Sequence, residues 1–504
     1  MNLPTPRHSN ISSAVLFGLA FVCAGFAASE RRPNIVLIFA DDLGWKDVGY
    51  NGSDFFETPN LDRMAKEGMV FHNAYAAAGN CAPSRACLLS GTYTPRHHVY
   101  AVGSTDRGPK ESQRLVPIPN RSGLAKENIT LADALRAAGY KTGHFGKWHL
   151  AGRAGALPRE QGFDMSFDSF GEGELPEGSE GNKTGPPSDP KGVFTLTRKA
   201  VEFIEANKDA PFFCFIAHHA IHTPLQARPE TLAKFEAKKP GAQHNNALYA
   251  ACTYDLDASV GMLLQKLKDL GLDDNTLVVF TSDNGALQTS SQEPLRGSKG
   301  GYYEGGIREP FLARWPGVIK PGSASHVPII NVDLFPTFLA AAGASTPAGK
   351  ILDGENLLPL FKAQGALRRE AIFWHFPGYL DKPVLRGRES DVRLGFRSRP
   401  VSVIRKGDWK LHLFHEEWQL DGGRAKLDTN HAVELYNLRT DIGERTNLAS
   451  RDKPKRDELL TDLLAWMQRA DALLPSEKNP AYKASAEAGP GKAGRGKKKQ
   501  GAEK

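Results

Sequence analysis

The sequence predicts an α/β fold in which a large, mainly parallel sheet is flanked by helices and followed by a smaller C-terminal antiparallel α+β domain. Three continuous apolar runs, 34–40, 211–217 and 276–281, predict strands that are buried on both faces. Helical patterns at 131–138 and 260–270 lie between these runs, and such alternation favours a parallel sheet. A chain of 504 residues can bury a large core without a disulfide or a structural metal.

The composition is that of a globular, loop-rich protein and excludes a fibrous protein, a coiled coil and a chain that is disordered throughout. It is 40% hydrophobic and 24% charged, with 50 glycines and 33 prolines. Residues 475–504 hold eight Lys and Arg against three Glu, so they carry +5 of the formal net charge of +7. The rest of the chain is nearly neutral, and its charge gives no argument for specific binding of nucleic acid.

Residues 1–29 are typical of a secretory signal peptide. They contain Arg7, an apolar run at 14–28 and small residues before the charged stretch 30–32. The run is too short for a comfortable membrane span, so we expect cleavage and no transmembrane span in the mature chain. The protein is therefore expected to be exported to the periplasm or the extracellular space.

The rest of the chain is predicted to form a catalytic domain at 30–362, a smaller domain at 363–474 and a basic tail at 475–504. Four short apolar runs predict a small antiparallel sheet in the smaller domain: 371–375, 400–404, 409–414 and 434–438. A helix around 456–473 is expected to close this sheet. The Lys-, Ala- and Gly-rich tail is expected to be disordered.

Polar residues follow each of the three strands in the catalytic domain, where open α/β sheets place their sites. Asp41 and Asp42 follow the first strand, a group of histidines follows the second, and Asp283 and Asn284 follow the third. Three carboxylates and an amide suit a hard cation such as Ca²⁺ or Mg²⁺ rather than Zn²⁺. A pair of Asp residues is also typical of a turn, so these residues alone leave both interpretations open.

The segment 81–91 carries the strongest chemical signal. Pro83 is placed to open a helix and Gly91 to close it, so Cys81 is expected at a helix N-terminus with Arg85 one turn further on. The helix dipole and the guanidinium both favour an anionic nucleophile there. The alternative for a lone Cys near an Arg is a small buried hydrophobic residue.

With this segment the sequence resembles the type I, formylglycine-dependent sulfatases of the alkaline phosphatase superfamily. Their signature, Cys-x-Pro-Ser-Arg followed by a short apolar stretch and Gly, matches 81–91, and the resemblance runs from about residue 33 to residue 448. Further family motifs follow in order: Asp41-Asp42-Leu43-Gly44, Gly146-Lys147-Trp148-His149, His222-Thr223-Pro224, Asp283-Asn284-Gly285, Lys299, Tyr303-Glu304-Gly305-Gly306 and Arg308-Glu309-Pro310. The resemblance implies an alkaline phosphatase-like fold and arylsulfatase-type hydrolysis of sulfate esters.

The resemblance also implies a nucleophile and a metal. A dedicated maturation enzyme would convert Cys81 to formylglycine (3-oxoalanine), whose hydrate attacks sulfur and later expels sulfate. Ca²⁺, or Mg²⁺, would be held by Asp41, Asp42, Asp283 and Asn284 together with the modified Cys81. The metal would act as a Lewis acid.

Five further residues receive roles from the same resemblance. Arg85 and His149 would orient and deprotonate the nucleophile. Lys147, Lys299 and His222 would contact the sulfate, and His222 or Lys299 would protonate the leaving oxygen. Taken alone, the two lysines would be interpreted as surface residues and His222 as a loop histidine.

The sequence does not name the substrate, which we expect to be a sulfated carbohydrate or small molecule, with aryl sulfates as surrogate substrates. The Gly- and Pro-rich loop at 152–192 and the aromatic segment 374–379 are the two places where substrate contacts are expected. For the aromatic segment, a small core in the second domain is an equally good interpretation.

Two other functions compete with this interpretation. A phosphoester or phosphonate hydrolase of the same superfamily would typically use a Ser or Thr nucleophile and two metals with His ligands, whereas this chain offers Cys81 and one oxygen-rich site. A non-catalytic polyanion-binding protein would use the basic tail. The intact set of catalytic motifs argues against this second alternative.

Overall fold

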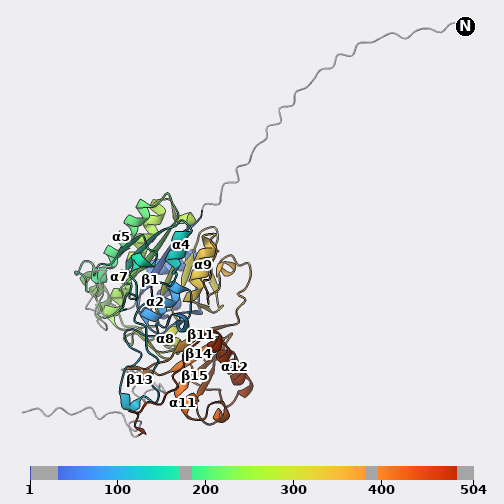
Figure 1. The fold of residues 1–504 in the computed structure, drawn as a ribbon. Coiled ribbons are helices and arrows are strands. Elements are labelled where there is room, and N and C mark those ends of the chain that lie inside the picture. Colours follow the sequence, from blue (N-terminus) through green and yellow to red (C-terminus); the bar gives the residue numbers. More distant parts are fainter. Residues whose placement is uncertain (2–31, 154, 171–183, 382–395, 485–504) are drawn as a thin grey trace, which may run out of the picture. The chain divides into compact units, whose positions relative to one another are not determined.

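An eight-stranded sheet lies at the centre of the large domain (Figure 1). In spatial order its strands are β5 (Met165–Phe167), β4 (Lys141–Gly146), β6 (Phe212–Ala217), β1 (Asn34–Ala40), β7 (Thr276–Ser282), β8 (Leu312–Arg314), β2 (Met69–Phe71) and β9 (Ser323–Ser325). β1 pairs in parallel with both β6 and β7, whereas β8 runs antiparallel to β7 and β2. The sheet is therefore mainly parallel, as predicted.

The computed structural model describes residues 1, 32–153, 155–170, 184–381 and 396–484. The predicted signal peptide, apart from Met1, lies outside the described residues. So do residues 154 and 171–183 of the predicted substrate loop and residues 485–504 of the tail. From Arg32 onward the chain forms one unit.

Alternate residues of β1 enter two different hydrophobic cores, because successive strand residues point to opposite faces of the sheet. Ile35 and Leu37 pack on one face, and Val36 and Ile38 on the other. The first core is covered by α2 (Cys81–Ser90), α4 (Leu131–Ala137), α9 (Leu334–Ala341) and α10 (Leu358–Phe361). The second is covered by α1 (Pro59–Glu67), α5 (Val193–Ala206), α6 (Pro229–Glu236) and α7 (Ala247–Asp269), and Figure 1 shows α5 and α7 across the sheet from α4 and α9.

The three predicted strands are confirmed to within one residue as β1, β6 and β7. The helix predicted at 260–270 is only the second half of α7, which begins thirteen residues earlier, at Ala247. The first half escaped prediction because carboxylates stand on its packed face. Buried Asp257 accepts backbone hydrogen bonds from Asn60 (3.0 Å) and Leu61 (2.8 Å), which start α1.

The smaller domain contains the predicted antiparallel sheet, with the order β11 (Ala371–Phe376), β14 (Val401–Lys406), β15 (Trp409–Phe414) and β16 (Val433–Asn437). α12 (Lys453–Arg469) packs on β14 and β15, near the helix predicted at 456–473. The remaining strands and α-helices of the described residues are short: β3 (Ala74–Tyr75), α3 (Thr94–His97), α8 (Glu304–Ile307), β10 (Ile329–Ile330), β12 (Leu380–Asp381), β13 (Phe396–Ser398) and α11 (His415–Leu420). The predicted fold class is confirmed.

The aromatic segment 374–379 belongs to the core of this smaller domain, so the second of the two interpretations left open for it is confirmed. Trp374, Phe376 and Tyr379 are at most 1% exposed. The Trp374 indole donates a hydrogen bond to Ala76 O at 2.7 Å, because a buried N–H needs a partner. The segment therefore packs in the small domain and joins it to the large one.

The first ten residues of the tail are anchored to the loop around residues 110–116. Val116 N donates to Glu477 O at 2.9 Å, and Asn479 N donates to Arg114 O at 3.0 Å. Lys483 N donates to Glu111 O at 2.9 Å. The prediction that the tail is disordered from residue 475 is therefore wrong for residues 475–484, because these backbone hydrogen bonds fix that part of the chain.

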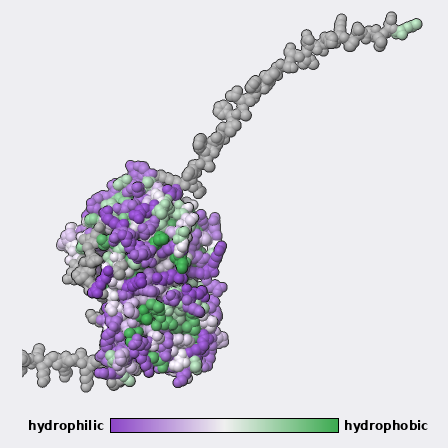
Figure 2. Space-filling view, in the orientation of Figure 1, coloured by the Kyte–Doolittle hydropathy of each residue, from purple (hydrophilic) through white to green (hydrophobic). Residues whose placement is uncertain are grey.

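Polar side chains cover most of the face seen in Figure 2, where a group of hydrophobic residues gathers over the C-terminal domain. In the part of the chain that the structure describes, we find no helix with the length and apolar character needed to cross a membrane.

A buried chain of hydrogen bonds links two histidines in the smaller domain through a serine. His375 Nε2 lies 3.0 Å from Leu473 O and must donate to it, so Nδ1 accepts from Ser402 Oγ at 2.7 Å. His415 Nε2 lies 2.9 Å from the same hydroxyl. Burial lowers the pKa of His375 to about 4, so this ring is neutral in the folded protein.

This arrangement predicts a loss of stability in acid. The unfolded chain takes up a proton on His375 near pH 6.5 and the folded chain only near 4, so the stabilisation is complete above pH 6.5 and is lost as the pH falls towards 4. Between pH 7.5 and pH 5, His375 alone should account for about 2 kcal/mol of lost unfolding free energy. Denaturant unfolding of the wild type and of His375→Gln, whose amide can make both hydrogen bonds, should differ by this amount. An equal loss in both proteins would contradict the assignment.

Candidate active site

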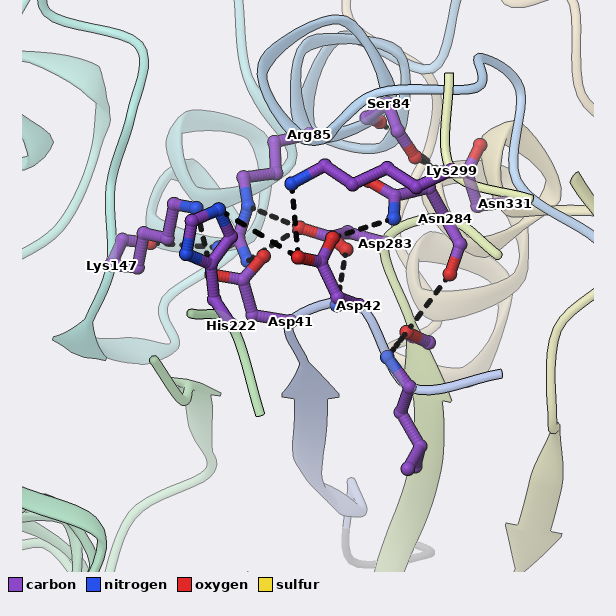
Figure 3. A network of polar contacts seen from close by, with 12 residues as sticks. Asp41, Asp42, Ser84, Arg85, Lys147, His222, Asp283, Asn284, Lys299 and Asn331 are labelled. Carbon is purple, nitrogen blue, oxygen red and sulfur yellow. Dashed lines mark hydrogen bonds and ion pairs between the residues drawn. The ribbon is translucent and has the colours of Figure 1, made fainter. Parts of the chain in front are cut away.

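The residues predicted to carry chemistry meet at the carboxyl ends of the central strands (Figure 3). The register of the parallel strands explains why, since β1 aligns Ala40 with Ser282 of β7 and Phe39 with Ala217 of β6. Asp41 and Asp283, which directly follow β1 and β7, are thereby placed side by side. β4 supplies Lys147 in the same way, because Gly146 aligns with Ala217.

Three carboxylates and one amide converge in this place, and all four side chains are fully buried. Asp42 adopts a left-handed backbone (φ 65°), and its N–H donates to Asp283 Oδ1 at 3.1 Å. Asn284 Nδ2 donates to Asp42 Oδ1 at 2.8 Å. Ligand atoms of Asp41, Asp42 and Cys81 all lie within 4.8 Å of one another. The predicted metal-ligating residues are therefore gathered at one point.

The donor set fits a hard cation. Within the described residues, Asp41 Oδ1 and Asn284 Oδ1 are buried and accept no hydrogen bond, although Asp41 Oδ1 lies 4.0 Å from Arg85 Nη2. Buried oxygens without a partner are costly and demand an explanation. Burial and the adjacent Asp41 carboxylate also raise the pKa of Asp283. A divalent cation among these oxygens would give the buried oxygens a partner and would offset the repulsion between the carboxylates.

Each carboxylate is paired with a cation. Lys147 Nζ lies 2.7 Å from Asp41 Oδ2, and Lys299 Nζ lies 2.9 Å from Asp42 Oδ2. Arg85 donates to Asp283 Oδ2 from Nη2 at 2.8 Å and from Nε at 3.1 Å. Burial alone would raise the pKa of Asp41, but Lys147 and its neighbouring cations outweigh burial and hold this pKa well below its usual range.

His222 points its Nε2 towards the carboxylates. Its Nδ1 lies 2.6 Å from Thr223 O and must donate to it, while Nε2 lies 3.7 Å from Asp42 Oδ2. Burial lowers the pKa of His222, but the Asp42 and Asp41 carboxylates outweigh burial, so the pKa is raised. The ring is thus placed to carry a proton on Nε2, facing the site.

Cys81 is the first residue of α2, as predicted, and all ten residues of this helix are buried. Gly91 ends the helix in the left-handed conformation (φ 66°) that glycine adopts without strain. Arg85, one turn on, donates from Nη1 to Lys147 O at 2.8 Å and interacts electrostatically with Cys81. His149 follows two residues after Lys147 with φ 65°, and its role in deprotonating the nucleophile stays a prediction.

The other two histidines after β6 have different surroundings. His219 Nε2 lies 2.9 Å from Asp168 Oδ1, in the predicted substrate loop. His218 is 1% exposed, and burial lowers its pKa to about 3, so it is a neutral core residue. His222 is therefore the histidine of this group that faces the metal-ligating set.

Two residues that support the site were not found from the sequence. Asn331 donates from Nδ2 to Ser84 Oγ at 2.8 Å and accepts from Ala77 N at 3.2 Å, which ties α2 to the chain after β3 (Figure 3). Asp47 accepts from Gly44 N at 2.8 Å and binds Tyr249 Oη, which closes the turn after Asp41 and Asp42. The signal for Asn331 was weak, since only the apolar pair of β10 precedes it.

Comparison with known proteins agrees with this geometry. The sulfatase family model matches residues 33–344. Human N-acetylgalactosamine-6-sulfatase is 36% identical over 500 residues, which cover 90% of this chain and 88% of that protein. A sulfatase of Formosa agariphila is 32% identical over an alignment of 556 positions, which covers 93% of this chain and 95% of that protein.

Solved structures extend the similarity to the fold. The crystal structure of Ps i-CgsB in complex with k-i-k-neocarrahexaose superposes with a TM-score of 0.65 at 30% identity, covering 89% of this chain and 95% of that chain. The phosphonate monoester hydrolase of Agrobacterium radiobacter gives a TM-score of 0.62 at 22% identity, covering 87% and 96%, and shares the fold alone. The match across most of the chain, together with the converging site residues, shows that this chain belongs to the sulfatase family and is a sulfuric ester hydrolase.

Proposed function

We propose that this chain is an exported sulfatase that removes sulfate from carbohydrates with a formylglycine made from Cys81 and one bound Ca²⁺. The observation that carries the proposal is the position of Cys81, at a helix start and within 4.8 Å of the Asp41 and Asp42 ligand atoms. The relatives support a sugar substrate, since one is named N-acetylgalactosamine-6-sulfatase and another was solved in complex with k-i-k-neocarrahexaose.

The thiol of Cys81 does not match its surroundings. Carboxylates and an amide prefer a hard cation, whereas a thiolate prefers a soft one. Conversion of Cys81 to formylglycine would replace the thiol sulfur by oxygen. One hydroxyl of the hydrated aldehyde would then attack the sulfur atom of the sulfate ester, and the second would allow sulfate to leave. The modification would thus make every candidate metal ligand at this site an oxygen donor.

The metal would be held by Asp41, Asp42, Asp283 and Asn284, with residue 81 facing it. Ca²⁺, or Mg²⁺ in its place, supplies Lewis-acid polarisation of the sulfate and lowers the pKa of the nucleophile when bound. Arg85 already bridges Asp283 and the chain at Lys147, so it can fix the nucleophile and the ligand set in one geometry.

The two lysines would bind the sulfate ester, and His222 would protonate the leaving oxygen. Lys147 and Lys299 are compact charges on flexible stems, which suits a tetrahedral anion. His222 reaches the site with Nε2 while Thr223 fixes its other nitrogen, so a proton on Nε2 can be donated outward to the substrate. We assign His149 to deprotonation of the nucleophile on the resemblance alone.

The organisation of the chain follows the same proposal. Residues 1–29 would direct export and be removed, 30–362 would carry catalysis, and 363–474 would form the smaller domain. A dedicated maturation enzyme would be the obligatory partner.

Mass spectrometry of active enzyme tests the nucleophile. The peptide that contains residue 81 should carry an aldehyde or its hydrate, because a thiol offers no oxygen nucleophile. The buried Cys214 and Cys252 should stay unmodified in the same sample and serve as internal controls. Cys81→Ala should abolish turnover while Cys252→Ala retains it. Full activity with an unmodified thiol at position 81 would refute the proposal.

The metal is tested by removing and restoring it. Chelation should abolish hydrolysis of an aryl sulfate and lower the melting temperature, and Ca²⁺ should restore both, because the set is all oxygen. Asn284→Ala should weaken Ca²⁺ binding at least ~10-fold in calorimetry. Asn275→Ala, which loses only a surface hydrogen bond to Arg32 O, is the matched control. Restoration by Zn²⁺ alone would contradict the choice of metal.

The role of His222 is tested with two leaving groups. His222→Ala should reduce kcat/KM for sulfated sugars about 10²- to 10⁴-fold more than for activated aryl sulfates, since only the basic sugar alkoxide needs a proton as it leaves. Lys147→Ala should reduce both equally, because both substrates present the same sulfate. The comparison requires protein with formylglycine content confirmed at residue 81. Equal losses for His222→Ala would transfer the acid role to Lys299.

A further inference from the structure

A buried cluster of charged side chains joins the C-terminal sheet to the loops of the active site. Lys410 of β15 lies with Nζ 2.9 Å from Glu304 Oε1 and 3.0 Å from Glu444 Oε1. The side chains of Lys410, Glu304 and Glu444 are all fully buried. Glu444 Oε2 also accepts a hydrogen bond from Glu304 N at 2.6 Å. One ammonium thus holds together two carboxylates from distant parts of the chain.

The other partners of the two glutamates come from both domains. Glu304 Oε2 accepts from Arg308 Nε at 2.7 Å and from Tyr75 Oη at 2.8 Å, on the side of the large domain. His412 Nε2 lies 3.1 Å from Glu444 Oε1, on the side of the small sheet. Loss of the Lys410 charge would leave Glu304 paired with Arg308 but would remove the ammonium that Glu304 and Glu444 share. Breaking a buried ion pair by removing one partner strongly destabilises the structure around it.

Glu304 is the first residue of α8, and the backbone of α8 supports the metal-ligating segment. Gly285, directly after Asn284, donates from N to Gly306 O at 2.9 Å. The two segments are so close that a Cβ on Gly285 would lie 2.0 Å from Gly305 O. A shift of α8 therefore moves the chain at Asn284.

The same short helix supports the loop that carries Lys299. Gly305 N donates to Arg296 O at 2.7 Å, and Lys299 N donates to Ala286 O at 2.9 Å. The C-terminal domain touches this loop a second time, because a Cβ on Gly300 would lie 2.3 Å from the Cδ atom of Arg397 in β13. The loop is thus held between α8 on one side and β13 on the other.

We propose that Lys410 is a positioning residue for the active site. With Glu304 and Glu444 it fixes α8, and through the backbone of α8 it fixes Asn284 and Lys299 without touching either. The C-terminal domain is then required to build the catalytic site. The inference rests on the metal-ligating and sulfate-binding roles proposed above for Asn284 and Lys299.

The test compares Lys410→Met with Ser402→Ala. Ser402 is buried in the same sheet and bonded to His375 and His415, so its loss weakens the domain without touching α8. Hydrogen–deuterium exchange of peptides spanning 284–306 should be faster in Lys410→Met and unchanged in Ser402→Ala. Calorimetric Ca²⁺ affinity and kcat for an aryl sulfate should each fall about 10- to 100-fold in Lys410→Met only.

Equal exchange at 284–306 in both variants, with equal kcat, would overturn the proposal and leave Lys410 a structural residue. If Lys410→Met fails to fold, Glu444→Gln replaces it, because glutamine keeps an acceptor for Glu304 N and removes one carboxylate charge. Unchanged exchange in Glu444→Gln would also overturn the proposal. If the wild type neither binds Ca²⁺ nor hydrolyses sulfate esters, the proposed function fails, while the exchange comparison still decides whether Lys410 positions the loop.

Discussion

Repulsion among three buried carboxylates is the constraint on which the active site depends. Two unit charges 4 Å apart repel by about 4 kcal/mol at the effective dielectric of a protein surface, and more in the interior. Asp41, Asp42 and Asp283 are all fully buried, so the fold must supply the compensating charge itself. Arg85, Lys147 and Lys299 do so, and each carboxylate lies within 3 Å of one of these cations. The parallel register of β1 and β7 brings the acids together, and these cations make that arrangement tolerable.

This balance of buried charges also suits the site to the two charged ligands proposed for it, a divalent cation and an anionic sulfate ester. The lysines neutralise carboxylates in this structure, at distances of 2.7 and 2.9 Å. A divalent cation bound to the same carboxylates would take over that neutralising role, and the lysines could then turn towards an anion. Binding of the metal and binding of the sulfate ester are therefore expected to favour each other, since each relieves a charge that the other leaves uncompensated.

Sequence reasoning succeeded where a local pattern has one physical cause. A continuous apolar run becomes a strand buried on both faces, and the residues after such strands share one edge of the sheet, so the amino-acid pattern alone was enough to group Asp41, Asp42, Asp283 and Asn284. It failed where polar side chains do the packing. Asp257 interrupts the apolar pattern of α7 because it caps α1, and the aromatic segment 374–379 gave no sign of which surface would cover it.

The supporting residues could not be found for a different reason. Asn331 acts on Ser84 across about 250 residues of chain, and Lys410 acts on Glu304 across about 100. No spacing rule relates such pairs, because only the folded topology brings them together. The candidate nucleophile and the candidate metal ligands could thus be predicted from motifs. The residues that support them, such as Asn331 and Lys410, could not.

The complete burial of α2 makes folding of the domain compete with the modification proposed for Cys81. Cys81 is 0% exposed and sits in a helix with no exposed residue, so a modifying enzyme has no access to it once the domain has closed. The modification proposed for Cys81 would therefore have to come first, and every molecule that folds faster than it is modified would be lost to catalysis for as long as it stays folded. The yield of active protein would then depend on two rates, and a variant that folds more quickly could be more stable and yet less active.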